Sequence, residues 1–471
     1  MRRRNTAILV AVAWLAATCL ACTAGRFAVA AEPQTQTAVQ MAIDLLGSGD
    51  ADVRQIALDR IRTGVRGEAA TRRLAELVPT LQPARQAELV TSLAERGDRA
   101  AVPAILALLG SSADATVRTA ALRGLAALGG TAEVPTLVAS LSAADPERSA
   151  ARRGLIVIDA AAGPAILAAV NGAEPGLKAT LLEVLAERRD RAALPLLAAA
   201  AVDDSPVVRA AAMRSLAGMG GPDQVDALVA GVLKAAAGAE RDDAQRALVA
   251  VCTQKPGKER SAAAFLDRFQ AADDASRDVL VPTLGRVGGE RAIAIVDGLV
   301  ASPDAATRRL GLAALTRWPD ATVTPRLLDL LAKTQDPAEH EQLLAALIRI
   351  APLPDNKLND AQKLELLQKT MTLCQQEADR RRVLERANAI RTVDTLRFVL
   401  PYLDDPALAE PACLSVVELA HHRTLRDAHK DEFVKALDKV IATTKNAELV
   451  ERAQRYKQGQ TWERKKPAAK G

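Results

Sequence analysis

Aromatic side chains are scarce in this chain: phenylalanine, tryptophan and tyrosine together account for 2% of its 471 residues. Apolar residues still reach 49% and charged residues 25%, a balance typical of folded rather than disordered proteins. The hydrophobic core must therefore be built from Ala, Leu, Val and Ile. Small side chains of this kind permit helices to approach one another closely in regular layers.

Runs of alternating β-branched residues are also missing, and apolar positions return every three or four residues throughout the chain. This periodicity predicts an all-α protein. A hydrolase triad has no support, because the chain has four histidines and no strand-turn-Ser element. The glycine pairs Gly129–Gly130, Gly220–Gly221 and Gly288–Gly289 lack the spacing of a phosphate-binding loop, so they indicate helix ends.

The first thirty residues have the three parts of a secretory signal peptide. Met1–Arg4 is basic, Ala7–Ala21 is apolar, and Ala28-Val29-Ala30 is a small-x-small cleavage site. Because the apolar run is short for a membrane span, we expect cleavage near Ala30 and export to the periplasm or the medium, rather than a retained membrane anchor. Leu20-Ala21-Cys22 leaves a lipid anchor at Cys22 as an alternative, although residue 19 is not the aliphatic residue expected there.

The net charge of the chain depends on this segment. The chain has 62 Lys and Arg residues against 57 Asp and Glu, and the segment holds four arginines and no acid, which leaves 58 against 57. A nearly neutral mature chain gives no support for a nucleic-acid partner. Cleavage also leaves three widely separated cysteines, Cys252, Cys374 and Cys413, an odd set that argues against a disulfide framework.

The clearest local pattern lies at residues 203–221. Asp204 or Ser205 can cap a helix whose first position is Pro206, and Gly220–Gly221 allows a left-handed exit from it. Close variants of this segment recur at 50–57, 114–121 and 304–310. One face of the helix carries Val208, Ala212, Leu216 and Met219.

Two independent markers share one period. Arginines near the starts of these helices lie 64, 91 and 99 residues apart, which correspond to two, three and three units of about 30 to 33 residues. Prolines in the first turn of the preceding helices follow the same spacing. The arginines are Arg54, Arg118, Arg209 and Arg308, and the prolines are Pro103, Pro135, Pro164, Pro195 and Pro325.

A unit of this length holds two short helices, and neighbouring pairs must stack to bury their apolar faces. The sequence therefore predicts a right-handed α-solenoid of about eleven or twelve helix pairs. The expected segments are a lead-in at 31–37, regular units over 38–350, degenerate units over 351–458 and a basic, frayed tail over 459–471. Within them we expect a polar loop at 253–260, a helix interrupted by Pro282, a linker at 351–360 and a last helix at Lys445–Tyr456.

The pattern Asp-x-x-Val-Arg-x-x-Ala-Ala-x-x-Leu, followed by Gly and then by a helix that begins near Val-Pro, resembles the HEAT-repeat family. More closely, it is similar to the short bacterial subtype of phycobilin lyases. The resemblance covers residues 38–350 well and is specific for the fold, but says little about function. It implies that four arginines, Arg54, Arg118, Arg209 and Arg308, form a buried structural ladder with nearby aspartates.

Enzymes that resemble this fold supply tests for chemistry. Deoxyhypusine hydroxylase is recognised by several His-Glu pairs that bind iron, and this chain has one such pair, His340-Glu341, in an expected first helical turn. A stable metal site needs three or four ligands, so a solvated helix start is the favoured interpretation. The other histidines are His421, His422 and His429. The last two could share the face of one helix, but neighbouring cations favour surface histidines there.

Two further activities of this fold have weak support. A lyase pocket for a tetrapyrrole would need clustered aromatic residues, and those of the mature chain are scattered. A glycosylase would need a basic face. Arg380-Arg381-Arg382 and Arg386 form one basic stripe, but interleaved acids favour a salt-bridged helix surface.

The sequence therefore predicts an exported scaffold that binds another macromolecule, most plausibly a protein, along one face of the solenoid. No catalytic residue, metal site or cofactor is predicted, and neither is a nucleic-acid partner or a membrane span in the mature chain. A HEAT-class enzyme that uses His340-Glu341 or the other histidines, and a purely structural spacer, remain the alternatives. An aromatic, acidic or apolar patch on the concave face would favour the binding scaffold.

Overall fold

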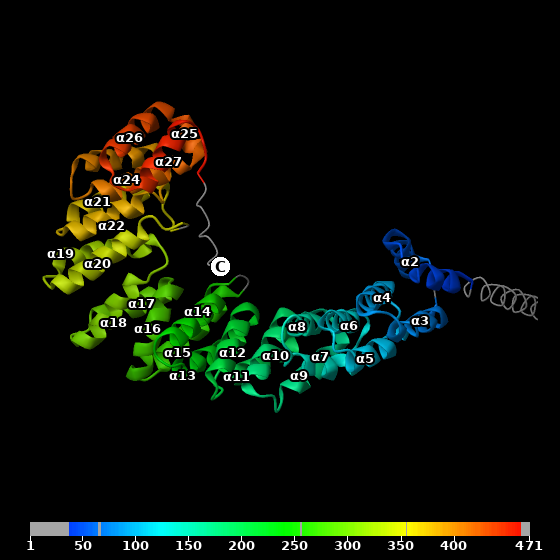
Figure 1. Ribbon diagram of the computed structural model, residues 1–471. Helices are drawn as coiled ribbons and strands as arrows, with labels where there is room; N and C mark the ends of the chain where they lie inside the picture. The colour runs from blue at the N-terminus through cyan, green and yellow to red at the C-terminus, as the bar shows by residue number, and fades with distance from the viewer. Residues whose placement is uncertain (1–36, 65–66, 255–256, 355, 463–471) are drawn as a thin grey trace, which may run out of the picture. The chain divides into compact units, whose positions relative to one another are not determined.

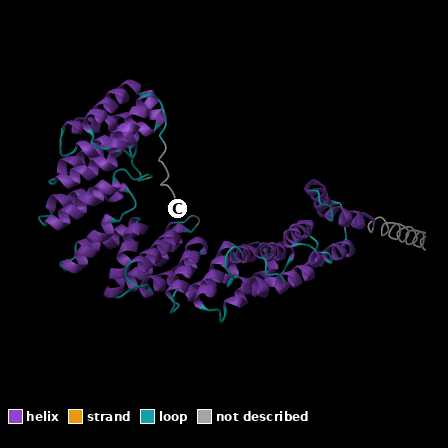
Figure 2. Cartoon of the chain, viewed as in Figure 1, coloured by secondary structure: helices purple, strands orange, loops and turns teal. Residues whose placement is uncertain are grey.

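The computed structural model describes residues 37–64, 67–254, 257–354 and 356–462. Every regular element in these ranges is a helix, as Figure 2 shows, so the predicted all-α solenoid is confirmed. The predicted signal peptide, its cleavage site and Cys22 lie outside the described residues.

Consecutive helices form pairs, of which we call the first member the A helix and the second the B helix. The first pair is Thr37–Leu46 and α2 (Ala51–Thr63). Packing divides the chain into two units, residues 1–220 and 221–471. In the first unit the A helices are α3 (Glu68–Ala75), α5 (Val102–Ser111), α7 (Val134–Ser140), α9 (Gly163–Val170) and α11 (Leu194–Ala200). Its other B helices are α4 (Pro83–Arg96), α6 (Ala115–Leu128), α8 (Glu147–Val157), α10 (Pro175–Glu187) and α12 (Pro206–Met219).

The B helices of the first unit pack on one another and form one layer, and the A helices form the layer behind it (Figure 1). Leucine and alanine fill the space between the layers. Leu89, Leu122 and Leu155 come from successive B helices and are fully buried. Each such side chain contributes about 2 kcal/mol of hydrophobic stabilisation, so the stack is held by many equivalent contacts.

The second unit repeats this arrangement. Its A helices are α13 (Val225–Lys234), α15 (Lys258–Ala271), α17 (Glu290–Val300), α19 (Thr324–Lys333), α21 (Asp360–Leu373) and α23 (Val393–Val399). Its B helices are α14 (Ala239–Thr253), α16 (Asp274–Val287), α18 (Ala305–Thr316), α20 (Pro337–Ile350), α22 (Glu377–Ala387) and α24 (Ala409–His421). The short α25 (Arg423–Ala428) then leads into the last pair, α26 (Lys430–Thr443) and α27 (Ala447–Lys457).

The proline marker of the A helices is confirmed, since all five of the marker prolines lie in the first turn. The prediction that Pro282 interrupts a helix is wrong, because α16 continues through it. An interior proline costs about 3 kcal/mol through one lost hydrogen bond and a clash. Burial of Leu280, Val281 and Leu284 on both sides of Pro282 offsets that cost, because these residues anchor the helix in the core.

The glycine pairs end helices as predicted, but two of them do so without the left-handed conformation. The φ angles are −75° and −144° at Gly129–Gly130, and −69° and −143° at Gly220–Gly221. A Cβ atom on Gly129 would lie 2.3 Å from the Leu125 carbonyl oxygen. Close approach of the backbone therefore requires glycine there, whereas Gly288–Gly289 has the positive φ angles of 64° and 95°.

The polar loop expected at 253–260 is shorter than predicted, because α14 continues to Thr253 and α15 begins at Lys258. The expected linker lies between Ile350, the end of α20, and Asp360, the start of α21. The linker is anchored by Asn356, which is fully buried and donates its side-chain amide to the carbonyl oxygens of Ile350 and Ala351 at 2.8 and 3.0 Å. These bonds satisfy carbonyl groups that the end of α20 leaves free. None of the described helices is alone long and apolar enough to cross a membrane; only Glu147–Val157 with Ala160–Val170 reaches that length and composition as a pair, bent by 105°.

Candidate interaction surfaces

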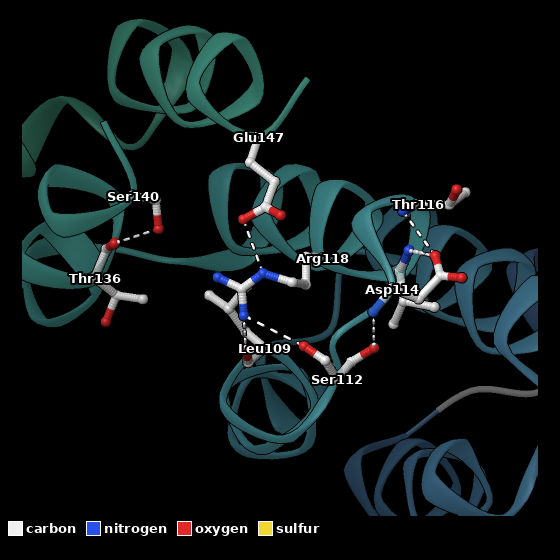
Figure 3. A network of polar contacts seen from close by, with 9 residues as sticks. Leu109, Ser112, Asp114, Thr116, Arg118, Thr136, Ser140 and Glu147 are labelled. Carbon is white, nitrogen blue, oxygen red and sulfur yellow. Dashed lines mark hydrogen bonds and ion pairs between the residues drawn. The ribbon is translucent and has the colours of Figure 1, made fainter. Parts of the chain in front are cut away.

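Several repeats are closed by an arginine from the first turn of the B helix, as the close view of Arg118 shows (Figure 3). One terminal nitrogen of Arg118 donates to the carbonyl oxygens of Leu109, in the last turn of α5, and Ser112, directly after α5, at 2.6 and 3.4 Å. Its Nε donates to a carboxylate oxygen of Glu147, at 2.8 Å, at the start of the next B helix. Arg118 therefore joins an A helix, its own B helix and the following repeat.

The same arrangement recurs at other repeats. Arg54 donates to the carbonyl oxygens of Ser48 and Gly49, and Arg209 donates to those of Asp203 and Asp204. Arg308 instead pairs with Glu339 of the next B helix at 3.2 Å. The structural role that the family resemblance implies for these arginines fits their contacts.

The expectation that these arginines are buried and pair with nearby aspartates is only partly correct. The aspartates mostly cap their own helices: the Asp114 carboxylate accepts from the amides of Thr116 and Val117, and that of Asp304 accepts from Thr307. The arginines bind backbone carbonyls and glutamates instead. The arginine side chain is long enough to extend beyond the capping aspartate to the turn that precedes the helix. Arg209 is 7% exposed, whereas the side chain of Arg308 is 39% exposed, so the row is not buried throughout.

His340 and Glu341 both lie near the start of α20 but face different neighbours. The Nε2 atom of His340 is 3.4 Å from Nε2 of Gln375, and Glu341 lies 3.7 Å from Arg382. No group of three or more His, Cys, Asp or Glu residues is placed to hold a metal ion in the described part of the chain. The contacts of the pair are thus those of a helix surface.

The idea that His422 and His429 share one helix is wrong. His421 ends α24, and His422 and His429 flank the two ends of α25, because the chain breaks into a short helix here. Nδ1 of His421 is hydrogen-bonded to the Tyr456 hydroxyl at 2.9 Å. Burial, and then the charge of Arg391, lowers the pKa of His422, which favours its neutral form.

The last helix carries an aromatic and arginine stack that the sequence did not reveal. The guanidinium carbons of Arg426 and Arg452 lie 5.3 and 5.9 Å from the ring centre of Tyr456. The guanidinium carbon of Arg452 also lies 5.0 Å from the ring centre of Trp462, which belongs to the segment expected to be a basic tail. Arg452, Tyr456 and Trp462 are close in sequence, and their alternation is a local signal, whereas Arg426 comes from the separate helix α25.

A groove of about 620 Å³ crosses three consecutive B helices of the first unit. Its floor contains buried Leu58, Ser92 and Ala120, and its rim is polar and charged. Arg62 on α2 pairs with Glu95 on α4 at 2.8 Å and closes one side. The lining residues are Gln55, Leu58, Arg62, Ala84, Ala87, Glu88, Thr91, Ser92, Glu95, Thr116, Thr119, Ala120, Arg123 and Pro146. An apolar floor with a charged rim is the composition of protein-binding surfaces.

Each unit has one further groove, which lies on its A-helix side. In the first unit, Ala75, Pro79 and Pro103 line a mainly apolar groove of about 410 Å³. In the second unit, Trp318 and Asp320 line a groove of about 600 Å³. Some of the charges in this groove neutralise each other, because Nζ of Lys357 lies 3.0 Å from a carboxylate oxygen of Asp320.

Residues 71–156 and 163–249 match the family model described as HEAT repeats. Those segments are therefore similar to HEAT repeats, which supports the predicted family for this part of the chain. The bacterial lyase-type subtype stays a prediction. No curated protein sequence matches the chain.

Among solved structures, the chain is similar to Kap121p bound to Pho4p, with a TM-score of 0.49 and 14% identity over 90% of this chain and 53% of that one. The karyopherin Kap121p bound to the extreme C-terminus of the phosphatase Cdc14p gives a TM-score of 0.49, with 13% identity over 87% and 54%. The chain thus spans about half the length of Kap121p. Human deoxyhypusine hydroxylase gives a TM-score of 0.25, with 20% identity over 62% of this chain and 98% of that enzyme. No inference about function follows from likenesses this distant.

Proposed function

We propose that this chain is an exported HEAT-repeat scaffold that binds another protein along the B-helix layer of its first unit. The groove across α2, α4 and α6 is the observation that carries the proposal. It spans three repeats, and a stack of repeats offers a long continuous surface whose solvent-facing residues can vary without disturbing the core.

The rim of the groove supplies the polar contacts that fix the register of a partner. Glu88 and Arg123 are exposed on its rim and form no ion pair with any residue in the described ranges. Charges left without partners at a rim steer association and select partners of complementary charge. Ala84, Ala87 and Pro146 also line the groove and are at least partly exposed, so they provide apolar area that a partner buries.

The test is capture of partners from the envelope extract of the source organism on tagged protein, residues 31–471. We expect one protein at stoichiometric yield that free bait displaces. Arg123→Glu should abolish its recovery, because it reverses a rim charge of the groove. Arg153→Glu is the matched control, since Arg153 is an exposed arginine of the neighbouring helix α8 that does not line the groove. Equal capture by both variants, or an empty capture, would contradict the proposal and favour a structural spacer.

Export and the segment boundaries belong to the same proposal. The supporting pattern is the basic, apolar and small-residue order of residues 1–30, followed by units over 38–350 and 351–458. Mass spectrometry of protein recovered from the periplasm or the medium tests it. A mature chain that begins at Ala31 would support export by cleavage. A lipid on Cys22 would show instead that the protein is anchored to a membrane. An uncleaved chain in the cytoplasm would refute export.

A further inference from the structure

The B helices of the second unit concentrate opposite charges at their two ends. Aspartates cap the starts of α16, α18 and α20, and an arginine lies at the end of each of these helices and of α22. Acids at the start of a helix and cations at its end both stabilise the helix dipole. The B helices pack side by side in one layer (Figure 1), so the helix ends that carry these cations follow one another along the layer.

We call the four residues Arg286, Arg317, Arg349 and Arg386 the arginine row. They are separated by 31, 32 and 37 residues, so each consecutive repeat contributes one. Arg286, Arg349 and Arg386 lie in the last turns of α16, α20 and α22, and Arg317 directly follows α18.

The guanidinium groups of the row influence one another. Arg349 donates to the carbonyl oxygens of Thr316 and Trp318, at 3.0 and 2.6 Å, and therefore lies beside Arg317. Burial, followed by the charge of Arg317, lowers the pKa of Arg286. Burial, followed by the charges of Arg386 and Arg317, lowers the pKa of Arg349. Each cation is thus close enough to its neighbours to be repelled by them.

No carboxylate relieves this repulsion by a direct ion pair with any of the four arginines in the described ranges. Asp242 acts on Arg286 only at longer range. Many other arginines of the unit are paired, such as Arg326 with Asp297 at 2.9 Å. Arg317 and Arg386 are exposed, and one terminal nitrogen of Arg286 is buried without a hydrogen-bond partner. The row is therefore a line of cations whose counter-charge the described chain does not supply.

We propose that the arginine row binds an extended, acidic segment of a partner protein, whose carboxylates meet the exposed Arg317 and Arg386. Packed helices lie about 8 to 10 Å apart. A partner segment in the polyproline-II conformation rises about 3.1 Å per residue with three residues per turn, so acidic side chains at every third position lie on one face, about 9 Å apart, and match the row. Carboxylates form charge-assisted hydrogen bonds to guanidinium groups, which are often bidentate and therefore directional. This site is independent of the groove in the first unit.

The spacing favours a peptide over a nucleic acid. A nucleic-acid strand in a duplex carries one charge per about 3.4 Å, roughly three times the density of the row. The mature chain is also nearly neutral, with 58 basic against 57 acidic residues, so it lacks the broad excess of positive charge that nucleic-acid binding requires.

The experiment is fluorescence anisotropy of labelled synthetic peptides with the purified protein. One peptide carries a glutamate at every third position among Gly and Ser, and the second has the same composition with its glutamates contiguous. We expect the spaced peptide to bind at least about fivefold more tightly, and its affinity to fall as salt is raised. The double variant Arg317→Gln with Arg386→Gln should lose at least about tenfold in affinity for the spaced peptide.

Arg309→Gln is the matched control, because Arg309 is an exposed arginine at the opposite end of α18. Its affinity should stay unchanged. Circular dichroism verifies that each variant is folded, and if the double variant is not, the single Arg386→Gln variant replaces it. Equal binding of the two peptides, no loss in the row variant, or equally tight binding of single-stranded oligothymidylate of the same charge would overturn the proposal.

Discussion

Arg209 offers the sharpest test of how the solenoid is stabilised. Its guanidinium is 7% exposed and donates to the carbonyl oxygens of Asp203 and Asp204 at 2.8 and 2.9 Å. Each charge-assisted hydrogen bond of this kind contributes about 1.5 kcal/mol, so Arg209→Ala should lower the free energy of unfolding by about 3 kcal/mol. The loss should spread to both neighbouring repeats, because stacked units share their interfaces.

Arg54→Ala is the matched comparison. Arg54 makes the equivalent bonds to Ser48 and Gly49, but in the first described repeat and with partial exposure to water. Water can replace the lost bonds there, so we expect a cost of about 1 kcal/mol or less. Urea unfolding followed by circular dichroism measures both variants. Equal costs for the two substitutions, or a cost below about 1 kcal/mol for Arg209→Ala, would refute the view that buried arginines hold the turns together.

Three further predictions concern other parts of the stack. Burial raises the pKa of the Cys252 thiol to about 12, so iodoacetamide should label it only after unfolding, and fast labelling of the native protein would contradict this. Burial alone would raise the pKa of Asp203, but hydrogen bonds from Lys178 and the Ser205 amide, together with nearby cations, lower it overall. This stabilisation is present above the unfolded pKa of about 4 and is lost as pH falls through the folded pKa, so Lys178→Ala should destabilise the protein at pH 7 and much less at pH 3. Gly285→Ala should cost about 2 kcal/mol in thermal unfolding, because its Cβ would lie 2.3 Å from the Ala314 carbonyl oxygen, whereas Gly298→Ala, with open space around it, should be neutral or stabilising.

The helix pairs were predictable because their signals are local. Asp114 caps α6, Pro103 lies in the first turn of α5, and both follow from the hydrogen bonds that helix starts leave free. Pro282 was not predictable on the same basis. Its local preference opposes a helix, but the buried residues around it keep α16 continuous, and that packing depends on neighbouring repeats.

The binding surfaces were less accessible to sequence reasoning. The floor of the groove joins Leu58 on α2 to Ala120 on α6, residues that no local pattern connects. The stack of Tyr456 on Arg426 and Arg452 depends equally on which helices meet. The arginine row, in contrast, has the period of the repeat, and a search for recurring residues at helix ends as well as helix starts would have found it.

Comparison of the two units shows why the arginine row is more than a set of helix caps. In the first unit Arg96 and Arg188 also lie at the ends of B helices, but their guanidinium groups bind backbone carbonyls of the preceding repeat, at Ile61 and Leu155. Arg349 does the same in the second unit, whereas Arg317 and Arg386 stay exposed, without an acidic partner among the described residues. An arginine whose only role is to stabilise the end of a helix would be more stable if it also donated hydrogen bonds to those backbone carbonyls. Repetition of unpaired cations beside one that is bound therefore indicates a counter-charge supplied from outside the chain, and this is what separates a binding edge from a stabilising one.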